Sequence, residues 1–130
     1  MNLIHFPFER VVEINAFILE TEPGMKGTAD INKLQGALGR IDNTIAYSGL
    51  NDVFEIAAKY TAALAHSLPD ANKRTGLAVG LEYLSLNDYE LIADNELFAD
   101  AVKDLVIGKL DEIDFADLLY SQYILEQSKT

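Results

Sequence analysis

Apolar residues recur at helical spacing along most of the chain, and this pattern restricts the fold more than any other feature. Gly, Pro, Asn and Asp interrupt the pattern between successive stretches. The sequence therefore predicts an all-α fold, a compact bundle of about six helices in a single domain that covers residues 1–130. The expected helices run from Pro7 to before Pro23, from Asp30 to about Ile41, from Asn51 or Asp52 to Leu64 or Ala65, over about 72–86, over about 95–107, and from Asp111 or Asp114 past Ile124.

One stretch, residues 45–50, has the features of extended backbone. Ile45 and Tyr47 are residue types that favour strands, and Ser48 with Gly49 is a turn signal. We therefore predict a short flap or hairpin over these six residues, the one extended piece in an otherwise helical chain.

The charge of the chain limits the partners that it can bind. The sequence has 21 acidic and 10 basic residues, a formal net charge of −11. Such a surface repels phosphate backbones and anionic membranes, which disfavours general binding to nucleic acid or membrane. A small phosphate ligand at one local cationic spot remains possible, because salt confines electrostatic fields to short range.

Composition also bears on the compartment. The chain has no cysteine, which fits a reducing cytosol. Its N-terminal residues lack the pattern of a secretory signal, and no apolar stretch is long enough to cross a bilayer. We expect a cytoplasmic protein.

The segment from His66 to Gly76 carries most of the candidate chemistry. It reads His-Ser-Leu-Pro-Asp-Ala-Asn-Lys-Arg-Thr-Gly and lies between two helical patterns. Pro69 prevents the preceding helix from continuing, so Asp70 to Arg74 straddles the start of the next one. The first N–H groups of a helix have no partner within the helix and carry partial positive charge, so this segment predicts an anion site.

Four residues at this helix start suit a phosphate. Ala71 is small enough for close approach of the backbone, Asn72 can donate its amide, Lys73 adds a point charge, and Arg74 can grip phosphate through its planar fork. Taken alone, Asn72 is an ordinary turn residue and the Lys-Arg pair an ordinary solvated pair. Their combination favours a phosphate-binding site.

His66 and Asp70 complete the candidate site. Histidine titrates near neutral pH, so His66 could take the proton of an attacking hydroxyl. Asp70 would repel phosphate directly but suits a Mg²⁺ ion that bridges phosphate oxygens. Each residue alone has a structural explanation, His66 as a helix-end histidine and Asp70 as an N-cap. The shared spacing favours the functional interpretation.

Two other groups of residues are interpreted structurally. His5 has no comparable neighbours and is predicted to be a surface or capping residue. An acidic cluster lacks the glycine and the alternating ligands of a calcium loop, and we predict a helix cap with a solvated face there. The cluster consists of Asp111, Glu112, Asp114 and Asp117.

The segment resembles the signature of the Fic/Doc superfamily, His-x-Phe-x-(Asp/Glu)-(Gly/Ala)-Asn-(Gly/Lys)-Arg. One position departs from it, since Leu68 stands where the signature has Phe. The variant Ala-Asn-Lys-Arg is similar to that of the Doc branch, the toxins of type II toxin–antitoxin systems. The residues on the pattern are His66, Asp70, Ala71, Asn72, Lys73 and Arg74.

The resemblance implies a Fic/Doc-type helical bundle and a kinase. Such an enzyme transfers the γ-phosphate of ATP, with Mg²⁺, to a threonine of elongation factor Tu and arrests translation. Lys73 is the distinguishing position, because most Fic proteins have glycine there and transfer AMP. A Fic-type adenylyltransferase is the alternative function, followed by a catalytically inactive Fic-fold binding module. A helical DNA-binding regulator is disfavoured by the net charge.

The resemblance also implies a partner and a role for the flap. Fic proteins are often restrained by an internal helix, but Ser121 and Glu126 are one residue too far apart for its motif. Restraint is therefore expected from a small cognate antitoxin in trans. The flap residues Tyr47, Ser48 and Gly49 are expected to align the substrate segment by pairing with it as a strand.

Overall fold

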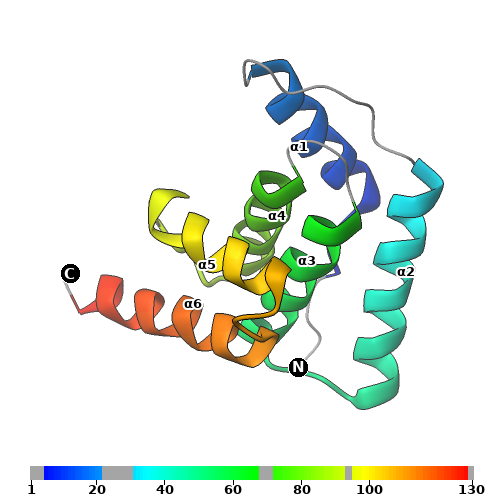
Figure 1. Ribbon diagram of the computed structural model, residues 1–130. Coiled ribbons are helices and arrows are strands. Elements are labelled where there is room, and N and C mark those ends of the chain that lie inside the picture. Colours follow the sequence, from blue (N-terminus) through cyan, green and yellow to red (C-terminus); the bar gives the residue numbers. More distant parts are fainter. Residues whose placement is uncertain (1–4, 22–30, 68–71, 93–94, 129–130) are drawn as a thin grey trace.

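Six helices make up the fold in the part of the chain that the computed structural model describes, residues 5–21, 31–67, 72–92 and 95–128. Figure 1 shows them as a bundle without a strand in these ranges, which confirms the all-α prediction. The helices are α1 (Phe8–Thr21), α2 (Ile31–Ser48), α3 (Val53–Ser67), α4 (Asn72–Leu86), α5 (Asn95–Ile107) and α6 (Glu112–Gln127).

The central helix is α3, which packs against α2, α4, α5 and α6 (Figure 1). Its buried residues include Ile56, Tyr60 and Leu64, none more than 1% exposed. Burying such side chains supplies about 1.5–3 kcal/mol each before the cost of ordering the chain. The position of each end of α3 is therefore set by the core of the molecule.

Tyr60 carries a polar group within this core. Its hydroxyl accepts a hydrogen bond from the backbone N–H of Phe6 at 3.3 Å and lies 3.4 Å from Asp42 Oδ1, to which it donates. Burial raises the pKa of Tyr60 to about 12, and the nearby carboxylate acts in the same direction. This hydroxyl ties the residues before α1 to the centre of the bundle.

Two helix starts have the predicted caps, whereas Asp30, the predicted cap of the second helix, lies outside the described residues. Asp52 Oδ1 accepts from the N–H groups of Phe54 and Glu55 at 2.9 and 3.1 Å, and so caps α3. Asp111 Oδ1 accepts from the N–H of Asp114 at 2.8 Å and caps α6. Such caps satisfy N–H groups that have no partner within the helix. The predicted end of α3 was too early, since the helix continues to Ser67 and includes His66 in its last turn.

The predicted flap over residues 45–50 is wrong. Residues 45–48 form the last turn of α2, and Gly49 follows with a φ of +67°. The N–H of Leu50 bonds to the carbonyl of Ile45 at 3.2 Å, the pattern of a Schellman helix end. The Ser-Gly turn signal thus marks a helix C-terminus, because a left-handed glycine serves that purpose as well as a hairpin turn.

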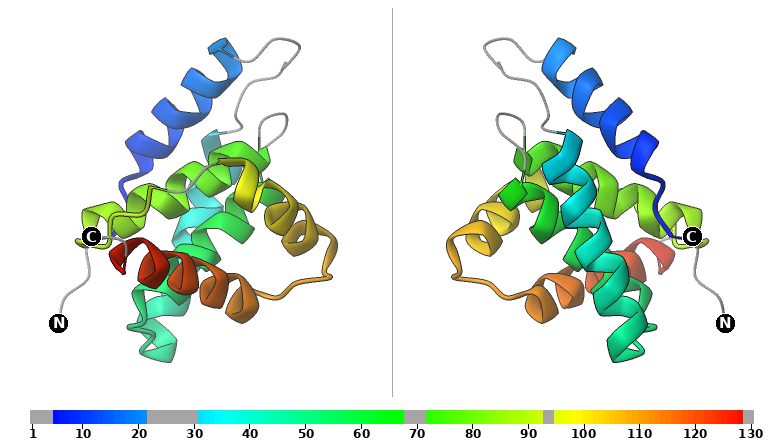
Figure 2. Two further views of the ribbon diagram at one scale, coloured as in Figure 1. Left: turned by 90° about the vertical axis from the view of Figure 1, so that its left-hand side faces the viewer. Right: turned by 90° about the vertical axis from the view of Figure 1, so that its right-hand side faces the viewer.

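The first helix lies at the edge of the bundle. Figure 2 shows α1 on the outside of the molecule, and within the described ranges it packs mainly against α4. Val11 and Ile14 are buried there, whereas Phe17 remains 65% exposed. The orientation of α1 is therefore set by its contacts with α4.

None of the helices described is both long and apolar enough to cross a bilayer.

Candidate active site

The last turn of α3 presents His66 to solvent. Leu64 and Ala65 immediately before it are fully buried, and His66 is exposed. Since successive residues of a helix are about 100° apart, burial of these two directs His66 away from the core. The core of the molecule thus fixes the backbone of this histidine and leaves its ring exposed.

The first turn of α4 presents two cations. Lys73 and Arg74 are exposed, and the chain becomes buried directly afterwards, at Thr75. The first turn of α4 has no acidic residue. Cations at a helix N-terminus oppose the helix dipole, at a cost of about 0.3–1 kcal/mol each when exposed. A bound anion would reverse this cost, because it would pair with both side chains and with the N-terminal N–H groups.

Close packing of α3 on α4 brings these two helix ends together. A Cβ atom added at Gly76 would lie 2.6 Å from the carbonyl oxygen of Thr61 and 3.2 Å from the backbone nitrogen of Ala65. One turn later, a Cβ at Gly80 would meet Thr61 Oγ1. Ala65 precedes His66, and Gly76 follows Arg74 by two residues. The backbones therefore approach closely at the point where the histidine and the cations leave the two helices.

Replacing Gly76 with alanine should destabilise the protein, because the added methyl group meets a backbone oxygen that cannot move aside. We expect the free energy of unfolding to fall by about 1–3 kcal/mol, the usual cost of overpacking. Gly39→Ala is the matched control, since nothing lies within 4 Å of a Cβ at that helical position. It should raise stability by about 0.5–1 kcal/mol.

Urea denaturation of Gly76→Ala and Gly39→Ala measures the free energy of unfolding of each variant. Equal effects of the two substitutions would contradict close contact between α3 and α4.

The candidate site residues fall into three groups. His66, Lys73 and Arg74 are described and lie at the adjoining ends of α3 and α4. Asn72 begins α4, and its side chain lies outside the described part of the structure. Asn72 forms the second group together with Asp70 and Ala71, which lie outside the described residues, as does Leu68. The third group is formed by Tyr47, Ser48 and Gly49.

Residues 47–49 are at the other end of α3 from His66. They precede the N-terminus of α3, and its 15 residues span roughly 20 Å at about 1.5 Å each. Tyr47 and Ser48 are helical, so they offer no free strand edge. Alignment of a substrate by strand pairing at these residues therefore lacks its structural basis.

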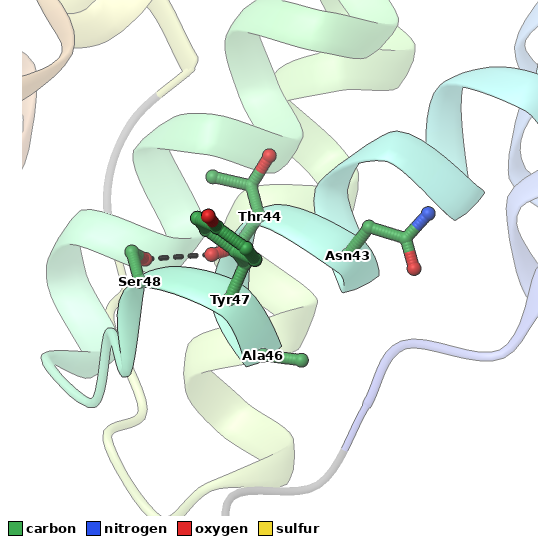
Figure 3. Close-up of a pocket in the computed structure, with 5 residues that line it drawn as sticks. All are labelled: Asn43, Thr44, Ala46, Tyr47 and Ser48. Carbon is green, nitrogen blue, oxygen red and sulfur yellow. Dashed lines mark hydrogen bonds between the residues drawn. The ribbon is translucent and has the colours of Figure 1, made fainter.

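Two hollows among the described residues also lie away from His66. Figure 3 shows one on the last two turns of α2, where Ser48 Oγ donates to the carbonyl of Thr44 at 2.6 Å. Tyr47 lines this hollow, and its side chain is 97% exposed. A second hollow lies beside it, around Lys59 and Glu112. Neither contains the histidine or the two cations.

The helix cap predicted in the acidic cluster and the exposed position predicted for His5 are confirmed. Asp111 caps α6, and Glu112 accepts from Lys59 Nζ at 2.9 Å. His5 is exposed, with its Nδ1 3.1 Å from Asp42 Oδ1. In the described ranges, no group of three or more His, Asp or Glu side chains could hold a metal ion.

Two features of the site were not predicted from the sequence. One is the pair Gly76 and Gly80, whose four-residue spacing is typical of close helix contacts and could have been noticed. The other is a buried hydrogen bond from Asn15 Nδ2 to Thr75 Oγ1, 3.0 Å long. Asn15 lies beside Ile14 and one turn after Val11, on the buried face of α1. This position is the one feature of the sequence that could have indicated that Asn15 is buried.

Comparison with known proteins identifies the family. No protein-family model matches the chain. Among curated proteins, it is similar to the protein kinase doc of Escherichia phage P1, with 30% identity over 121 residues. The match covers 92% of this chain and 95% of the phage protein. The chain belongs to the Doc branch of the Fic/Doc superfamily, as the signature residues indicated.

Proposed function

We propose that the chain is a toxin kinase of the Doc type, which transfers the γ-phosphate of ATP to a threonine of elongation factor Tu and thereby arrests translation. Its similarity to a protein named as a kinase supports the reaction class. The observation that carries the proposal is the arrangement of His66 against the cationic first turn of α4. An exposed histidine and two exposed cations adjoin there, and we assign them the roles of proton acceptor and anion site.

The reaction uses these groups in a single displacement. His66 accepts the proton of the threonine hydroxyl as the hydroxyl oxygen attacks the γ-phosphorus. A new bond forms between that oxygen and phosphorus, and the bond to the bridging oxygen breaks, so ADP leaves with the electron pair. Lys73 and Arg74 stabilise the charge on the phosphate oxygens throughout, and the site acts mainly by positioning and charge neutralisation.

A Mg²⁺ ion belongs to this proposal, and Asp70 is its proposed protein ligand. Mg²⁺ with a nucleotide usually takes one or two carboxylates and completes its shell with phosphate oxygens and water. One acidic residue next to an anion site is thus a sufficient donor set, and a larger acidic cluster is not needed. The ion would neutralise phosphate charge when bound, and the roles of His66 and Arg74 do not depend on its exact place.

Lys73 favours transfer of phosphate over transfer of AMP. It occupies the second residue of α4, where most Fic proteins have glycine, and it is exposed in the first helical turn. A lysine there fills space beside the backbone and adds a charge close to the phosphates. We propose that it holds the nucleotide with its γ-phosphate toward His66.

The proposed restraint is a small antitoxin encoded beside the toxin. The net charge of −11 suits a partner segment that is basic and folds on binding. Toxin, antitoxin and elongation factor would then meet in the cytoplasm.

Expression of the chain alone should stop growth and the incorporation of labelled amino acids. The reason is that no inhibitory helix motif is present, so nothing within the chain is expected to block the site. Co-expression of the small protein from the neighbouring gene should restore both. The His66→Ala variant, expressed to the same level, is the control and should leave growth unaffected. A parent protein that becomes active only after trimming of its own terminus would contradict inhibition in trans.

A further inference from the structure

A buried polar pair joins α1 to the first turn of α4. Asn15 Nδ2 donates to Thr75 Oγ1 at 3.0 Å, and the two residues are 2% and 0% exposed. Thr61, also buried and polar, donates within its own helix to the carbonyl of Ala57. The bond between Asn15 and Thr75 differs from the bond of Thr61, because it links two helices and involves side chains alone.

The pair lies at the site end of the contact between α1 and α4. Thr75 directly follows Arg74 in the chain. The second link between the helices is exposed and lies two turns further along α4, where Arg10 donates to Glu82 at 2.6 and 2.7 Å. The two helices thus run antiparallel, with the buried link beside the candidate site and the ion pair at the far end.

A buried hydrogen bond fixes orientation more tightly than an apolar contact does. Rotation of the first turn of α4 would break the bond and leave the Asn15 amide buried without its acceptor, at a cost of about 1–3 kcal/mol. Lys73 and Arg74 leave the same turn from its exposed side. Since neighbouring residues of a helix turn together, holding Thr75 also holds the directions in which the two cations project.

We propose that Asn15 and Thr75 are positioning residues, which orient the first turn of α4 so that Lys73 and Arg74 meet the phosphates of the nucleotide. This inference rests on the proposed function, because it assigns the pair a role through that site. The pair itself does not touch the nucleotide.

The test uses isosteric substitutions in the full-length protein. Thr75→Val and Asn15→Leu each remove one partner, and the double variant removes both. Each single variant should lower kcat/KM for ATP by roughly 10- to 100-fold, the scale expected for a displacement of about 1 Å. Thr75→Ser keeps the hydroxyl and should restore most of the rate.

The double variant distinguishes a loss of orientation at the first turn of α4 from a loss of protein stability. Replacing both partners with apolar groups of similar shape is close to neutral for stability, so its melting temperature should recover toward that of the parent. Its kcat/KM should stay low, because the directional bond is still absent. Glu82→Gln weakens the far link between the same helices and is the matched control, which should leave kcat/KM unchanged. If the double variant recovers both properties, or if Glu82→Gln lowers kcat/KM as much as Thr75→Val, the inference is overturned.

Two readouts do not depend on transfer to a protein. One is the Kd for Mg²⁺-ATP, and the other is hydrogen exchange at the amides of residues 76–79, which bond to the carbonyls of the first turn in an α-helix. If the parent binds ATP but transfers nothing, the proposed function fails. Weaker binding and faster exchange in Thr75→Val would still support the positioning role, and unchanged values of both would overturn it.

Discussion

His66→Ala should lower the rate of phosphoryl transfer by roughly 10²–10⁴-fold, the usual contribution of a general base. The affinity for ATP should change little, because the base acts on the attacking hydroxyl and mainly in the transition state. The fold should be unaffected, since His66 is exposed and substitutions of exposed residues usually change stability by less than about 0.5 kcal/mol. Single-turnover kinetics with a nucleotide titration measures both quantities.

The second histidine of the chain provides the control. His5 is exposed and lies beside Asp42, so His5→Ala removes a histidine away from the proposed site. Its transfer rate should match that of the parent. Unfolding of His66→Ala, or transfer by it at a near-normal rate, would identify His66 as a structural histidine.

Arg74→Ala should weaken ATP binding as well as the rate, because in the proposed site its charge contacts phosphate in both the ground state and the transition state. We expect kcat/KM to fall by at least about 10²-fold, the scale found when one preorganised donor is removed from a site of developing charge. Arg74→Lys should fall between parent and alanine, since lysine keeps the charge but lacks the planar fork. Calorimetric titration with Mg²⁺-ATP and steady-state kinetics separate the two effects.

Arg10→Ala is the matched control for Arg74→Ala. It also removes an exposed arginine, but one that pairs with Glu82 toward the far end of α4. The hydrogen bonds to Glu82 and Glu13 raise the pKa of Arg10. Equal loss of ATP affinity in both variants would indicate a general effect of net charge.

Helix positions were predictable because periodicity and capping act locally. The spacing of apolar residues located all six helices, although the second continues to Ser48 instead of ending near Ile41. Asp52 and Asp111 cap α3 and α6 at predicted positions. The motif was predictable for a similar reason, since its residues lie close together in the sequence. His66 lies next to the first turn of α4 because Gly76 and Gly80 let α4 pack closely against α3.

The flap could not be distinguished from a helix end by sequence alone. Ile45 and Tyr47 favour strands, but helix propensities differ by less than about 1 kcal/mol per residue and tertiary contacts override them. Ile45 is half-buried and packs against the core, which supports the helical form. The Ser-Gly pair is compatible with both structures, because a left-handed glycine ends a helix or forms a hairpin turn.

The buried pair was unpredictable for another reason. Asn15 and Thr75 are separated by 59 intervening positions in the chain, and their contact depends on how α1 docks on α4. An asparagine on a helix is exposed in most proteins, so its burial becomes apparent only in the folded structure.

Transfer of label from ATP to purified elongation factor Tu tests the central claim most directly. Reactions contain Mg²⁺ and ATP labelled at either the γ or the α phosphate, with His66→Ala as the blank. The proposed chemistry predicts γ label on a threonine of the factor, no transfer of α label, and no transfer by the variant. Appearance of α label on the protein would contradict it, because the chain would then be an adenylyltransferase and the role assigned to Lys73 would be wrong.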